Sequence, residues 1–100
     1  MVIRIDRAGV RLLDPDDFGQ FKVTALDRSV VATGVPAFGR AGDDEDHVFV
    51  EPDALRALAG ARASDPVWAA SFEQMVAFAA THGWISEDGA IRAHLECDPA

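Results

Sequence analysis

Residues 66–82 constrain the fold of this chain more than any other segment. Ser64-Asp65-Pro66 is a typical helix start, and Gly83 is a typical helix end. Between them, apolar side chains recur at helical spacing, and further apolar residues lie off that stripe. The stripe is Trp68, Phe72, Met75, Val76 and Ala79, and the residues beside it include Val67 and Phe78. The pattern predicts a helix over about 65–82 that is apolar around most of its circumference.

Such a helix is expected to lie at the centre of its fold or in contact with another chain. One hundred residues provide a limited amount of other structure to cover it. We therefore expect part of this helix to contact a partner. The candidate interface residues are Val67, Trp68, Phe72, Met75 and Phe78.

A shorter helix is predicted over about 52–60. Pro52 suits the first helical position, where its missing N–H has no partner to lose. Leu55, Leu58 and Ala59 follow the helical spacing of a buried face, and Gly60 is expected to end the helix.

The N-terminal part of the chain has the pattern of short strands. Residues 2–6 and 10–13 are separated by a turn with Gly9, which predicts a β-hairpin. Residues 21–26 alternate, and a turn at 27–29 leads to a predicted return strand at 30–33. Residues 47–50 resume a strand after a stretch rich in glycine and acidic residues, 34–46, which we expect to be a flexible loop.

The segment 90–97 alternates strictly between apolar and polar residues. Ile91, Ala93, Leu95 and Cys97 alternate with Arg92, His94 and Glu96. This pattern favours a strand with one buried face. The spacing of Ile91 and Leu95 also fits a helix, which remains an alternative. Taken with the preceding elements, the chain is expected to form one α+β domain, with a small antiparallel sheet of about four to six strands packed against two helices.

The charge of the chain restricts its partners. The sequence has 17 acidic and nine basic side chains, which gives a formal net charge of −8. Nucleic acids and anionic membranes are therefore not expected as partners, whereas a basic partner would be attracted. The N-terminus has no apolar signal segment, and Cys97 is the single cysteine, so a cytoplasmic location is expected. The preference for Ala and for Arg over Lys suggests a bacterial source with a GC-rich genome.

The familiar catalytic and cofactor-binding motifs do not occur in the sequence. The chain has no glycine-rich nucleotide loop, no G-x-S-x-G and no H-E-x-x-H. His47, His82, His94 and Cys97 are potential metal ligands, but they lack the close pairing of zinc ligands. No catalytic residue, metal or cofactor is predicted.

Two groups of residues are candidates for ligand binding. On a strand, Arg92, His94 and Glu96 share one face, and an imidazole between a guanidinium and a carboxylate can bind a polar ligand. The same row also fits an ordinary solvated face. His82 and Trp84 lie together after the long helix, and Trp84 could form the wall of a pocket or an interface.

The sequence thus supports two hypotheses about function. The first is a non-enzymatic binding or accessory protein that acts through protein contacts, either as a homodimer or with a basic partner. The alternative is a small-molecule-binding domain or small enzyme with a pocket near His82, Trp84 and His94.

Overall fold

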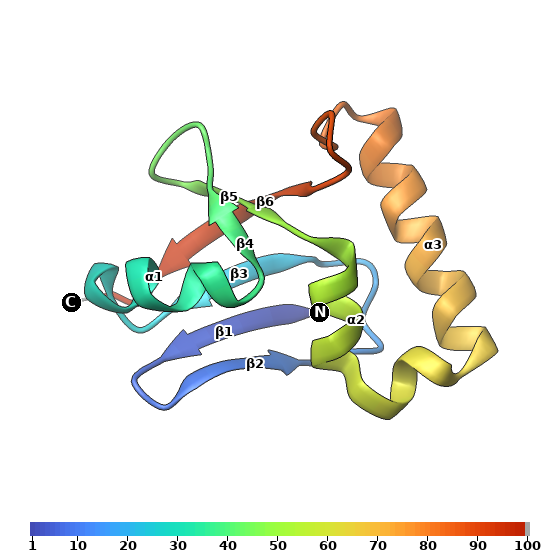
Figure 1. Ribbon diagram of the computed structural model, residues 1–100, viewed down its shortest axis with the longest axis horizontal. Coiled ribbons are helices and arrows are strands. Elements are labelled where there is room, and N and C mark those ends of the chain that lie inside the picture. The colour runs from blue at the N-terminus through green and yellow to red at the C-terminus, as the bar shows by residue number, and fades with distance from the viewer. Residues whose placement is uncertain (100) are drawn as a thin grey trace.

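The computed structural model describes residues 1–99 and shows a curled sheet with helices at its sides (Figure 1). Its strands are β1 (Val2–Asp6), β2 (Gly9–Leu13), β3 (Lys22–Ala25), β4 (Gly39–Ala41), β5 (His47–Val50) and β6 (Ile91–Cys97). The helices are α1 (Arg28–Gly34), α2 (Pro52–Ala59) and α3 (Pro66–Thr81), with short 3₁₀ turns η1 (Val35–Ala37) and η2 (Gly60–Ser64). The predicted α+β class and number of strands are confirmed, although the described residues contain three α-helices rather than two.

The six strands form one mixed sheet in the order β2-β1-β3-β6-β5-β4. The predicted β1–β2 hairpin is confirmed, but β3 runs parallel to both β1 and β6, so the sheet is not purely antiparallel. Residues 14–21 cross the end of the hairpin and bring β3 to the free edge of β1. The Met1 amino group donates hydrogen bonds to the carbonyls of Asp17 and Gln20 in this crossing segment. Strand alternation indicates which residues are buried, but it does not encode the direction of the neighbouring strand.

The return strand predicted at 30–33 is wrong, because these residues belong to α1. The Asp27 carboxylate accepts a hydrogen bond from the Val30 backbone N–H at 3.2 Å, as a helix N-cap does. Val30 is buried in the core, and α1 contacts β1 and β3. Capping and packing therefore outweigh the β preference of the valines.

The region 34–46 is more structured than the sequence suggests. It contains η1 and the edge strand β4, and Phe38 between them is buried. The part of this region outside regular structure is chiefly residues 42–46, which join β4 to β5. Pairing of β4 with β5 orders a glycine-containing stretch that has no periodicity of its own.

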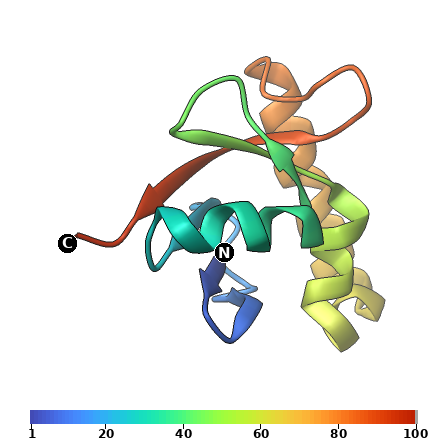
Figure 2. The same cartoon turned by 60° about the vertical axis from the view of Figure 1, so that its left-hand side comes forward.

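The core lies on the concave side of the sheet. In both views, α1 lies between the β1–β2 and β4–β5 hairpins (Figure 1, Figure 2). Alternate strand residues, such as Ile3, Val23 and Leu95, are buried there, while their neighbours form a polar outer face. On that face Arg4 forms an ion pair with Asp98, with 2.6 Å between Nη2 and Oδ2.

The long helix α3 stands beside the sheet rather than flat against it (Figure 1). Its predicted boundaries are confirmed: the Asp65 carboxylate caps the Val67 N–H at 2.8 Å, and Gly83 follows the helix with a φ of +74°. Segment 91–97 is the strand β6, as the alternation favours. Within residues 1–99, none of the helices combines the length and apolar character needed to cross a bilayer.

Candidate functional site

A cleft of about 520 Å³ opens where the sheet splits beside α3. The ladder between β3 and β6 begins at Val23 and Leu95, although β6 itself begins at Ile91. The first residues of β6 therefore extend beyond β3, and residues 18–21 lie across the gap. At the far end of the gap, the Arg92 N–H donates to the Trp84 carbonyl at 2.7 Å. The cleft is thus a consequence of strand register.

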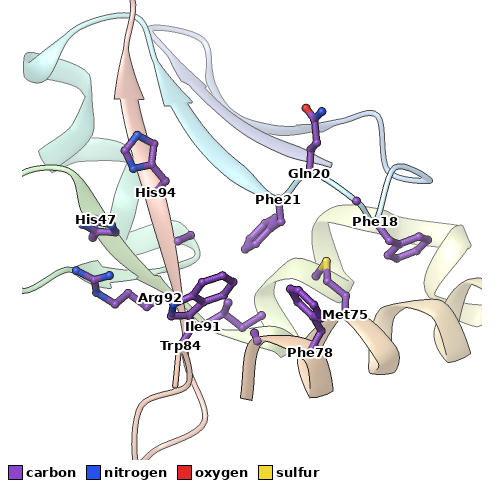
Figure 3. Close-up of a pocket in the computed structure, with 13 residues that line it drawn as sticks. Phe18, Gln20, Phe21, His47, Met75, Phe78, Trp84, Ile91, Arg92 and His94 are labelled. Carbon is purple, nitrogen blue, oxygen red and sulfur yellow. The ribbon is translucent and has the colours of Figure 1, made fainter. Parts of the chain in front are cut away.

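One side of the cleft is apolar and rich in aromatic rings. Figure 3 shows Phe21, Met75, Phe78 and Trp84 on the same side of β6, around a shared space. Phe18 extends this wall and packs against Trp68 of the core, with 5.6 Å between ring centroids. Aromatic and thioether side chains offer a large apolar contact area to a ligand.

The other side of the cleft is polar. His47, Arg92 and His94 lie there, on β5 and β6 (Figure 3). The two imidazole rings meet edge to face, with 5.5 Å between centroids. Arg92 Nε donates to Asp43 at 3.0 Å, and His47 Nδ1 donates to Asp44 at 2.8 Å. These hydrogen bonds lower the pKa values of the two carboxyl groups, which stay ionised at neutral pH.

An aromatic cluster closes the C-terminal end of α3. The His82 ring lies 4.2 Å from the Phe78 ring and 4.7 Å from the Trp84 ring, measured between centroids. His82 Nδ1 also donates to the Phe78 carbonyl at 3.0 Å. These contacts hold the Trp84 indole at the mouth of the cleft, where 42% of the residue remains exposed.

The structure brings together three of the five residues predicted to bind a ligand. Trp84, Arg92 and His94 line the cleft. His82 does not line it and instead supports Trp84 from behind. Glu96 also lies outside the lining, and its carboxylate pairs with Lys22 at 3.1 Å.

The predicted interface residues divide into buried and exposed groups. Trp68 and Phe72 are 4% and 0% exposed, so they belong to the core and not to an interface. They stack on each other, and Trp68 Nε1 donates to the Pro15 carbonyl at 2.9 Å. Met75 is half-buried and lines the cleft. Val67 and Phe78 remain 76% and 58% exposed.

The cleft is also lined by Phe18, Phe21 and His47, which the sequence does not mark as ligand-binding residues. Phe18 and Phe21 lie in the segment before β3, and His47 begins a different strand. The two phenylalanines are apolar, and this property predicts a position in the core as readily as one in a binding site. Their common cleft depends on β3 pairing with β6 only from Val23 onward.

The cleft is lined by apolar side chains together with a few polar ones. Its 13 residues include two imidazoles, but no carboxylate, hydroxyl or thiol side chain comes from the described part of the chain. No group of three or more His, Cys, Asp and Glu side chains within residues 1–99 is arranged to hold a metal ion. The site therefore offers apolar contact, hydrogen bonding and charge.

Comparisons with protein-family models, curated proteins and solved structures gave no match for this chain.

Proposed function

We propose that this chain is a non-enzymatic binding protein that contacts a partner protein through the cleft and the adjoining surface of α3. The observation that supports this proposal best is the amphipathic cleft, with Phe21, Phe78 and Trp84 opposite Arg92 and His94. Open apolar pockets with a few polar groups at one side are the usual form of ligand sites. Cys97 is a free thiol in the structure, and we propose a cytoplasmic location for the protein.

The alternative of a small-molecule site or small enzyme uses the same cleft. His47 or His94 could accept a proton there, but both imidazoles also face carboxylates. His94 Nε2 lies 3.6 Å from Glu96, and His47 is hydrogen bonded to Asp44. We favour binding because these contacts account for the imidazoles without a substrate.

A neutral apolar dye tests whether the cleft binds ligands. Nile red is expected to bind the folded protein, and Trp84→Ala is expected to weaken binding by about tenfold because a wall of the cleft is lost. Fluorescence titration measures the affinity. Circular dichroism verifies that the variant is folded.

Val67→Ala is the matched control, because Val67 is an exposed apolar residue of α3 that does not line the cleft. It should leave the affinity for the dye unchanged. Binding that is insensitive to Trp84→Ala, or that depends on Val67 instead, would contradict the proposed site.

Self-association is a second candidate function, supported by the exposed side of α3. Within Pro66–Thr81, Glu73 is the only charged residue, and Val67 is 76% exposed. A helix surface with so little charge places few like charges at a contact between two chains, although the net charge of −8 on each chain opposes their approach over a longer range.

Sedimentation equilibrium tests this second candidate. We expect wild-type protein to form a dimer and Val67→Glu to weaken it by at least about tenfold, because a carboxylate would enter the interface. Ala57→Glu places the same charge on an exposed position of α2 and should leave the dimer intact. A monomeric wild-type chain at all concentrations would refute self-association.

A further inference from the structure

Two acidic turns adjoin the cleft. Residues 43–46 lead into His47, and the carboxylates of Asp43 and Asp44 contact Arg92 and His47 of its lining. Glu87 and Asp88 lie in the turn that follows Trp84. These turns are far apart in the sequence, but each adjoins a residue that lines the cleft. Carboxylates of the 43–46 turn therefore lie next to the polar side of the cleft.

The basic residues near the cleft do not balance these carboxylates. In the 43–46 turn, Arg92 contacts Asp43 and Asp44, and Arg28 lies 3.6 Å from Asp46. The turn thus has four carboxylates and two guanidinium partners, so its net charge is −2 when His47 is neutral. In the turn after Trp84, Arg40 pairs with Asp88 at 2.9 Å, and Glu87 forms no ion pair with another residue of the described range 1–99.

Arg92 is the only guanidinium or ammonium group among the described residues that line the cleft. Its Nε and Nη2 atoms are directed to Asp43 and Asp44, at 3.0 and 3.4 Å. Figure 3 shows the guanidinium group on the His47 side of β6, away from Phe21, Phe78 and Trp84. An anionic ligand would have to compete with two carboxylates for this group.

We infer that the cleft binds a segment of a partner protein in which a Lys or Arg lies next to an apolar side chain. This inference rests on the binding function proposed above and specifies the partner. The apolar side chain contacts Phe21, Phe78 and Trp84, while the positive charge lies at the acidic 43–46 turn. The aromatic rings also attract a cation that approaches their faces. The net charge of −8 attracts such a segment over a longer range.

Two matched peptides test the inference. The first is acetyl-KLFLK-amide, and the second is acetyl-ELFLE-amide, which has the same apolar centre and the opposite charge. Binding is followed by the indole N–H signal of Trp84 in ¹H–¹⁵N NMR spectra, assigned with Trp84→Phe. At low salt the Lys peptide is expected to bind at least about tenfold more tightly than the Glu peptide, and added salt should reduce this preference.

A double variant, Asp43→Asn with Glu45→Gln, tests the role of the 43–46 turn. It is expected to reduce the preference for the Lys peptide to below about threefold, because two carboxylates are neutralised. Asp53→Asn is the matched control, because Asp53 is an exposed acidic residue of α2 that pairs with Arg56 and does not line the cleft. The control should retain the full preference.

The possible outcomes separate this inference from the proposed function. Equal binding of the two peptides, or tighter binding of the Glu peptide, would overturn the inference about charge and leave the cleft as a binding site. Binding of Nile red without binding of either peptide would also overturn it. If neither the dye nor the peptides affect Trp84 in folded protein, the proposed function fails as well.

Discussion

Phe72→Ala is expected to lower the free energy of unfolding by about 3 to 5 kcal/mol, the usual cost of removing a buried aromatic ring. Phe72 is 0% exposed and stacks on Trp68, with 5.2 Å between ring centroids. The Arg56 guanidinium of α2 lies over the Phe72 ring, 4.7 Å from its centroid. Phe72 therefore joins α3 to both the core and α2, and its removal leaves a cavity at that junction. Urea denaturation measures the change.

Phe78→Ala is the control for this prediction. It removes the same ring from the same helix at a position that is 58% exposed. Its cost should be below about 1 kcal/mol, as for most exposed positions. Similar losses for the two variants would mean that α3 is not anchored through Phe72.

Gly39→Ala is expected to destabilise the protein by about 3 kcal/mol, at the upper end of the cost of overpacking. A Cβ atom on Gly39 would lie 1.8 Å from the Phe49 carbonyl oxygen in the paired strand β5. This atom belongs to the backbone, so a change of rotamer cannot relieve the clash. The edge strand β4 would have to separate from β5. The loss should appear in urea denaturation and as faster amide exchange in β4 and β5.

Gly19→Ala is the matched control for this substitution. Its added Cβ would meet the Asp17 carboxylate at 3.5 Å, which is an ordinary contact distance. A change within about 0.5 kcal/mol is expected. If Gly39→Ala were equally mild, the close pairing of β4 with β5 would be wrong.

The elements predicted best from the sequence are those with strong local signals. The Asp65-Pro66 start and the glycine after His82 bound α3 through capping and turn chemistry that need no distant partner. The strict alternation of residues 91–97 predicted a strand, because one side of it is buried. Residues 30–33 show the limit of such reasoning: the cap from Asp27 and the packing on β1 make them helical despite two adjacent valines.

The candidate site was predicted only in part, for a related reason. Trp84, Arg92 and His94 stood out because each carries a functional group near a turn or on an alternating strand. His82 and Glu96 stood out equally, but strand direction and local stacking place them outside the cleft. Phe18 and Phe21 could not be assigned to the site, because their role depends on a partner strand about 70 residues away.

The sequence alone therefore determined the properties that act locally or add up over the chain: the long apolar helix, the alternating strand, the α+β class and the net charge of −8. The tertiary structure decided which strands pair and in which direction, and hence where the sheet splits. It also decided which aromatic residues are core and which remain exposed. The physical reason is that helix caps and strand alternation reflect interactions between near neighbours, whereas the cleft arises from the register of β3 against β6, which is set by packing between distant segments.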